Sequence, residues 1–135
     1  MMTMTRKLAA AVTMIGIAGL AGLSAAQAAS TDLKTWDTDH DGTIDLAEAK
    51  SAAEAKFTGL DSDHDGTIDR KESHGAISKR SFAKADVDKD GTVDKSEYLN
   101  LVEARFNAAD TDHDGTVSES ELKTPAGKSL ASLLK

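Results

Sequence analysis

Four twelve-residue segments of the chain carry carboxylates at the same spacing. They are DTDHDGTIDLAE from Asp37, DSDHDGTIDRKE from Asp61, DVDKDGTVDKSE from Asp86 and DTDHDGTVSESE from Asp110, here named loops one to four. Carboxylate oxygens are preferred ligands of hard cations such as Ca²⁺. Of the 23 Asp and Glu residues in the chain, 19 fall on the repeated oxygen-bearing positions of these loops. Negative charge is therefore concentrated where a multivalent cation would sit.

The order of residues within each loop matches the EF-hand pattern. That pattern places side-chain oxygens at positions 1, 3, 5, 9 and 12, a backbone carbonyl at position 7 and a Gly at position 6. A single acidic loop can be only a solvated turn, but four complete matches in register favour metal binding. We expect each Glu at position 12 to bind with both oxygens. The predicted ligands are Asp37, Asp39, Asp41, Thr43, Asp45 and Glu48 in loop one; Asp61, Asp63, Asp65, Thr67, Asp69 and Glu72 in loop two; Asp86, Asp88, Asp90, Thr92, Asp94 and Glu97 in loop three; and Asp110, Asp112, Asp114, Thr116, Ser118 and Glu121 in loop four.

Three loops also carry a histidine at position 4. His40, His64 and His113 raise the alternative of a zinc or copper site, because imidazole is a common ligand of both metals. No two histidines have the spacing of a ligand pair, and side chains at position 4 normally point outward. We therefore expect these histidines, and also His74, to lie at the surface.

Apolar residues recur one helical turn apart just before each loop, which predicts a helix leading into every loop. The connectors 46–60 and 95–109 contain no internal Pro and are predicted as unbroken helices, each shared by two loops. In the middle connector, Gly75 is typical of a helix stop and Ser78 of an N-cap for a helix to Ala85. Thr124 and Pro125 should cap a final helix. The predicted core residues are Leu33, Trp36, Phe57, Leu60, Phe82, Ala85, Phe106 and Ala109, and the predicted final helix contains Leu130, Leu133 and Leu134.

These lengths predict an unusual pairing of the loops. A helix of fifteen residues is about 22 Å long, so the two loops at its ends cannot touch. A break at Gly75 would let the chain double back, which pairs loop two with loop three and loop one with loop four. We expect short strand contacts at Ile44, Ile68, Val93 and Val117. The predicted fold is all-α, a compact helical bundle with four EF-hand loops at its periphery.

The first 28 residues have the composition of an export signal. Arg6 and Lys7 precede an uncharged segment from Leu8 to Leu23, and Ala26-Gln27-Ala28 is typical of a signal peptidase site. The alternative is a membrane anchor, but sixteen apolar and small residues are short for a bilayer of about 30 Å. We predict a signal peptide over 1–28 and a single four-loop domain over 29–135, periplasmic or secreted, without stable membrane association.

Removing the predicted signal peptide changes the net charge from −7 to −9, because Arg6 and Lys7 are the only charged residues in that segment. The chain contains no Cys, which excludes a disulfide or a lipid-linked cysteine. It contains no basic stripe, so nucleic acid is not an expected partner. The predicted partners are metal ions.

The processed chain resembles the lanmodulin family of periplasmic, lanthanide-binding EF-hand proteins over nearly its whole length. The resemblance rests on loops separated by only twelve or thirteen residues, on Asp at position 9 of three loops, on DKSEYLNLVEARFNAAD and on the tail TPAGKSLASLLK. It implies a metal-induced collapse into a compact three-helix core, the ligand positions given above, and a preference for trivalent lanthanides over Ca²⁺. The chain departs from that family at position 2, where the usual Pro is replaced by Thr38, Ser62, Val87 and Thr111.

The negative charge of the loops also favours binding of a multivalent cation. Loops one to three each offer five carboxylates, whose mutual repulsion a central ion relieves in proportion to its own charge. Loop four, with Ser118 in place of Asp, should be the weakest and least selective site. We expect up to four lanthanide(III) and/or Ca²⁺ ions per chain, and a loose chain without them. Mg²⁺ fits poorly because it demands a tight octahedron.

Three classes of function make different demands on the sequence. A metal carrier or buffer needs only the sites. A Ca²⁺ sensor that signals to a protein partner stays an alternative, although such sensors often use a Met-rich groove and residues 29–135 contain no Met. An enzyme would need a nucleophile or an acid–base pair beyond the metal ligands, and none is evident. We therefore predict a binding protein without enzymatic activity.

Overall fold

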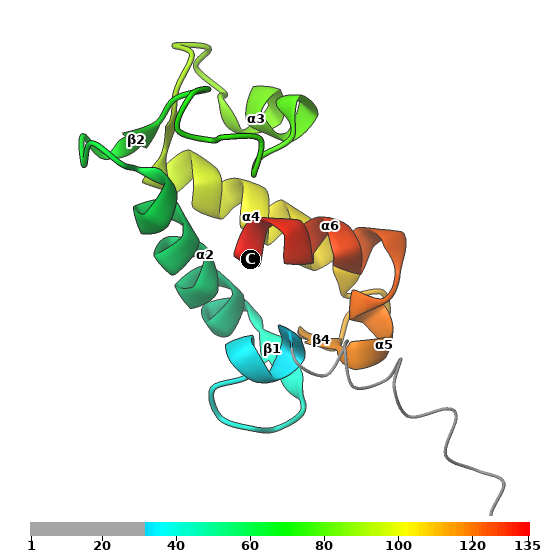
Figure 1. Ribbon diagram of the computed structural model, residues 1–135. Helices are drawn as coiled ribbons and strands as arrows, with labels where there is room; N and C mark the ends of the chain where they lie inside the picture. Colours follow the sequence, from blue (N-terminus) through cyan, green and yellow to red (C-terminus); the bar gives the residue numbers. More distant parts are fainter. Residues whose placement is uncertain (1–31) are drawn as a thin grey trace, which may run out of the picture.

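The structure is a computed structural model that describes residues 32–135 (Figure 1). The predicted signal peptide over 1–28 lies outside the described residues. Among residues 32–135, no helix is both long and apolar enough to span a membrane. The elements are a helical turn over 32–36, β1 (Thr43–Asp45), α2 (Leu46–Leu60), β2 (Thr67–Ile68), α3 (Lys79–Ala85), β3 (Val93–Asp94), α4 (Lys95–Ala109), β4 (Thr116–Ser118), α5 (Glu119–Leu122) and α6 (Pro125–Leu134). The predicted all-α fold is confirmed.

The two long helices begin and end on loop residues. At the start of α2, the Asp45 side chain accepts a hydrogen bond from the Glu48 N–H, and the Glu48 side chain accepts one from the Asp45 N–H. This reciprocal capping box satisfies two of the unpaired donors of the first turn. The helix ends where the Asp61 N–H donates to the Phe57 carbonyl. α4 is built in the same way, and both helices have the predicted bounds.

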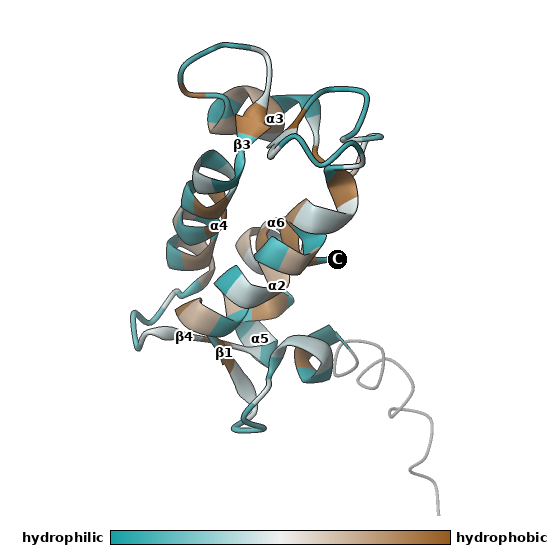
Figure 2. Ribbon diagram, turned by 90° about the vertical axis from the view of Figure 1, so that its left-hand side faces the viewer, coloured by the Kyte–Doolittle hydropathy of each residue, from teal (hydrophilic) through white to brown (hydrophobic). Residues whose placement is uncertain are grey.

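The loops pair as predicted, one with four and two with three. β1 runs antiparallel to β4 with Ile44 opposite Val117, and β2 runs antiparallel to β3 with Ile68 opposite Val93. All four of these side chains are fully buried. Figure 1 shows the two loop pairs at opposite ends of α2 and α4, and Figure 2 shows that the loops are hydrophilic. Each pair therefore anchors its two loops to the core through one apolar contact.

The middle connector was expected to contain a helix that stops at Gly75, but no α-helix forms between β2 and α3. After β2 the chain forms a single turn, in which the Ser73 N–H donates to the Asp69 carbonyl at 3.0 Å. His74 and Gly75 then adopt positive φ angles of 42° and 80°, a conformation that ends helical propagation. The expected N-cap is confirmed, because the Ser78 side chain accepts from the Ser81 N–H at the start of α3.

The core is formed where α2, α4 and α6 pack against one another. The predicted core residues are all buried, and α6 contributes Leu130, Leu133 and Leu134. Tyr98 of α4 is fully buried; its hydroxyl donates to the Leu133 carbonyl at 2.7 Å. Its ring centroid lies 5.8 Å from that of Phe57 on α2. Tyr98 thus connects all three helices, which is a packing role that the sequence pattern did not predict.

Loop four is joined to α6 by a close backbone contact. A Cβ atom at Gly127 would overlap the carbonyl oxygen of Glu121, so only glycine allows α6 to approach α5 at this point. The Thr124 hydroxyl donates to the same Glu121 carbonyl at 2.7 Å and accepts from the Gly127 N–H at 3.0 Å. The residue that closes loop four is therefore fixed directly against the helix that completes the core.

Candidate metal centres

Carboxylates from three parts of each loop converge on one point. In every loop, oxygens of the residues at positions 1, 3 and 12 lie within 4.8 Å of one another. Position 1 follows the leading helix, position 3 lies in the turn, and position 12 lies in the first turn after the strand. The four clusters are Asp37, Asp39 and Glu48; Asp61, Asp63 and Glu72; Asp86, Asp88 and Glu97; and Asp110, Asp112 and Glu121. The structure thus brings together twelve of the predicted ligands.

The Asp at position 1 is buried in all four loops, with an exposed fraction between 5% and 8%. One oxygen of each accepts a hydrogen bond from the Gly N–H at position 6, over distances from 3.0 to 3.2 Å. In loops two and three, the other oxygen, Oδ1 of Asp61 and of Asp86, is buried without a hydrogen-bond partner. A buried carboxylate oxygen that lacks a partner is costly, and a cation would satisfy it.

The turn of each loop depends on left-handed backbone at two positions. In loop one, His40 at position 4 has φ 62° and Gly42 at position 6 has φ 89°, and the other loops repeat these values closely. The side chains of His40, His64 and His113 are exposed, and the clusters found among the described residues contain no histidine. These histidines therefore form part of the turn and do not belong to the carboxylate clusters.

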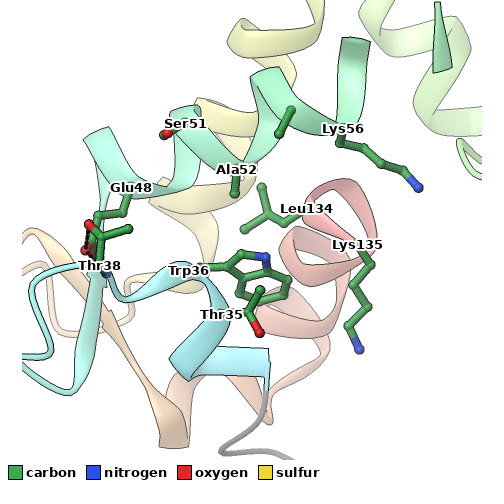
Figure 3. A pocket seen from close by; sticks show the side chains of 10 residues that line it. Thr35, Trp36, Thr38, Glu48, Ser51, Ala52, Lys56, Leu134 and Lys135 are labelled. Carbon is green, nitrogen blue, oxygen red and sulfur yellow. Dashed lines mark hydrogen bonds between the residues drawn. The ribbon is translucent and has the colours of Figure 1, made fainter. Parts of the chain in front are cut away.

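The Glu at position 12 is held across the loop by hydrogen bonds to both of its oxygens. In loop one, Glu48 Oε2 accepts from the Asp45 N–H at 3.1 Å, and Oε1 accepts from the Thr38 N–H at 2.6 Å and the Thr38 hydroxyl at 2.8 Å (Figure 3). The other three loops repeat the two backbone bonds. These donors aim the carboxylate at the Asp residues of the cluster.

The carboxylates at positions 5 and 9 lie outside the clusters and shape the loop backbone. Asp41 Oδ1 accepts from the N–H and hydroxyl of Thr43, at 2.8 and 2.7 Å, and the same pair of bonds recurs in every loop. Asp45 at position 9 is the N-cap of α2. The Thr at position 7 begins or directly precedes the strand. Sequence reasoning named these residues as ligands and missed their part in positioning the turn.

Hydrogen bonds lower the pKa of three of the four closing glutamates. The Ser118 N–H has the largest effect on Glu121 and, together with donors from Thr111 and the Ser118 hydroxyl, lowers its pKa to about 2 despite burial. The pKa of Glu72 is lowered chiefly by the Asp69 N–H. Burial raises the pKa of Glu48, but its several donors outweigh burial and the pKa is lowered. These carboxylates are anionic at neutral pH, the form that binds cations.

Crowding of negative charge within the loop affects the Asp at position 3 of loop one. The Asp41 N–H lowers the pKa of Asp39, yet burial and the neighbouring charges of Asp41 and Glu48 outweigh it, and the pKa is raised. Burial and nearby like charges both raise a carboxylate pKa, and a bound cation would lower it again.

Comparison with known proteins supports the same assignment. The family model described as EF hand matches residues 32–49, 56–72, 77–102 and 101–124, which is more than half of the chain and includes all four loops. No curated protein matches the chain.

Proposed function

Because the chain belongs to the EF-hand family, we propose that it is an exported carrier or buffer of multivalent cations, with up to four lanthanide(III) and/or Ca²⁺ ions per chain. The observation that carries this proposal is the pair of buried, unpartnered oxygens on Asp61 and Asp86. Each of these oxygens lies in a loop whose carboxylates at positions 3 and 12 already converge on the Asp at position 1. EF-hand proteins are in general binding proteins, so the chain's chemistry is uptake and release of the ion.

The ligand set favours an ion of high charge. Loops one to three each contain five carboxylates, and a trivalent ion attracts each of them about one and a half times as strongly as Ca²⁺ at equal distance. Loop four offers four carboxylates and a serine, so it should discriminate least. We therefore propose that lanthanide(III) ions bind in preference to Ca²⁺.

A carrier or buffer fits the surface better than a sensor does. Among residues 32–135, Val87 is the one large apolar side chain that is exposed, at 75%. A Ca²⁺ sensor signals by offering an apolar groove to a partner helix. One valine, at position 2 of loop three, is too small for such a groove. The periplasmic or extracellular location is part of the proposal and rests on the predicted signal peptide over 1–28.

The ion preference is testable with terbium emission. Trp36 directly precedes loop one and lines a groove together with Thr38 and Glu48 (Figure 3), so we expect its indole to sensitise Tb³⁺ bound in that loop. We expect Tb³⁺ emission excited through tryptophan to rise to a plateau. Displacement by Ca²⁺ should need roughly a 100-fold excess or more, which corresponds to about 2.8 kcal/mol.

La³⁺ serves as the matched competitor, because it has the same charge as Tb³⁺ and does not emit. It should displace Tb³⁺ at near-equimolar concentration. If near-equimolar Ca²⁺ displaces Tb³⁺ equally well, the lanthanide preference is wrong and the protein is a calcium buffer.

A further inference from the structure

Three of the four loops carry a side-chain hydroxyl that reaches across the loop to the closing glutamate. Thr38 Oγ1 donates to Glu48 Oε1 at 2.8 Å. Ser62 Oγ donates to Glu72 Oε1 at 3.1 Å, and Thr111 Oγ1 donates to Glu121 Oε1 at 3.0 Å. In each case the backbone N–H of the same residue binds the same oxygen. Position 2 thus supplies two donors to one carboxylate oxygen.

Loop three provides the internal comparison. Its position 2 is Val87, whose N–H donates to Glu97 Oε1 at 2.9 Å and whose side chain points into solvent. The Glu97 side chain still caps α4 and still lies in its cluster. The loop therefore forms without the hydroxyl, so the hydroxyl is not needed for folding of the loop itself.

We propose that the residue at position 2 is a positioning residue whose hydroxyl strengthens metal binding in loops one, two and four. Loop three lacks this hydroxyl. The inference rests on the proposed function and adds a determinant of affinity to it. The glutamate must present both oxygens to the ion, and free rotation of its side chain opposes that arrangement. The hydroxyl adds a donor on Oε1, which in loops one and two also accepts from the position 3 N–H, and thereby restricts the rotation and leaves the remaining lone pairs of the carboxylate directed at the cluster.

The chain itself suggests the substitutions that test this role. Thr38→Val copies the position 2 residue of loop three and removes only the hydroxyl, since valine has nearly the same shape. Thr38→Ser copies loop two and keeps the hydroxyl. Val87→Thr adds the missing hydroxyl to loop three. Both Thr38 and Val87 are exposed, so these changes should leave the helix content of the metal-saturated protein, measured by circular dichroism, unchanged.

Each loop contains its own reporter for a site-by-site titration. The Gly42 N–H donates to Asp37 and the Gly91 N–H donates to Asp86, and the resonances of these amides in NMR spectra should move when the neighbouring carboxylates bind an ion. Titration with La³⁺, in the presence of a competing chelator, gives the affinity of each loop separately.

We expect Thr38→Val to weaken loop one about tenfold, the lower end of the range for groups that orient a metal ligand, because the backbone donor remains. Thr38→Ser should restore wild-type affinity, and Val87→Thr should tighten loop three by a similar factor. If wild-type loops bind La³⁺ and Thr38→Val binds it equally well, the positioning role is wrong. If no wild-type glycine amide responds to La³⁺ or Ca²⁺, the proposed function itself has failed.

Discussion

Removal of metal from the processed chain, residues 29–135, should abolish roughly half or more of its helical signal in circular dichroism. α2 and α4 each contain 15 residues, and isolated helices of that length are marginal in water. Their ends are formed by the loops, where the acidic residues repel one another until a cation binds. The free energy of metal binding should therefore appear as free energy of folding.

The expected size of the effect follows from linkage. An ion at 100 times its dissociation constant stabilises the state that binds it by about 2.7 kcal/mol, so four independent sites contribute about 11 kcal/mol. The whole stability of a small domain is about 5–15 kcal/mol. Metal is thus expected to decide whether the bundle is folded.

The measurement compares far-ultraviolet spectra with excess chelator and with saturating La³⁺ or Ca²⁺. A control in NaCl at matched ionic strength separates specific binding from general screening of the negative charge. Equal helix content with chelator and with metal would contradict coupled folding, whatever the affinity of the sites.

The second large effect is expected from Glu97→Gln in loop three. The change removes one charge and one of the two oxygens that the closing residue offers, while glutamine still fits the first turn of α4. Loop three should lose more affinity than the roughly 10–100-fold typical of groups that only orient a ligand. The Gly91 amide should then respond to La³⁺ only at much higher concentration.

The matched control is Glu103→Gln on the same helix. Glu103 pairs with Lys50 of α2 at 2.7 Å, lies outside the loops and is partly exposed. Such surface pairs contribute about 0–1 kcal/mol, so this change should leave all four sites unaffected. Comparable losses in the two variants would show that Glu97 acts through helix stability alone.

The pairing of the loops predicts which other loops lose affinity in Glu97→Gln. Thr67 lies opposite Asp94 and Ile68 opposite Val93, so a disturbed loop three should weaken loop two through the strands. Loops one and four pair at the far end of the long helices and should change little. Equal weakening of all three remaining sites would argue against communication through the paired strands.

Much of the fold was predictable because the loops and helices share residues. The Asp that begins a loop ends a helix and the Glu that closes it lies in the first turn of the next, so the spacing of the acids determines helix lengths as well as site positions. Those lengths forbid the two loops at the ends of one long helix from touching, and the predicted pairing of Ile44 with Val117 and Ile68 with Val93 is confirmed.

Other features depend on contacts that spacing does not reveal. The buried hydroxyl of Tyr98 on the Leu133 carbonyl and the close approach at Gly127 require α6 to cross the other two helices, which no local pattern indicates. The hydroxyls of Thr38 and its equivalents looked only like a departure at position 2. Their partner lies ten residues away and became evident only in three dimensions.

The four crowded carboxylate clusters are expected to require multivalent cations. Isothermal titration calorimetry on metal-free residues 29–135, with CaCl₂ and with LaCl₃ in separate experiments, tests this requirement most directly. We expect saturable heat with both ions, La³⁺ binding more tightly and reaching up to four ions per chain. Absence of heat with both ions would contradict the account.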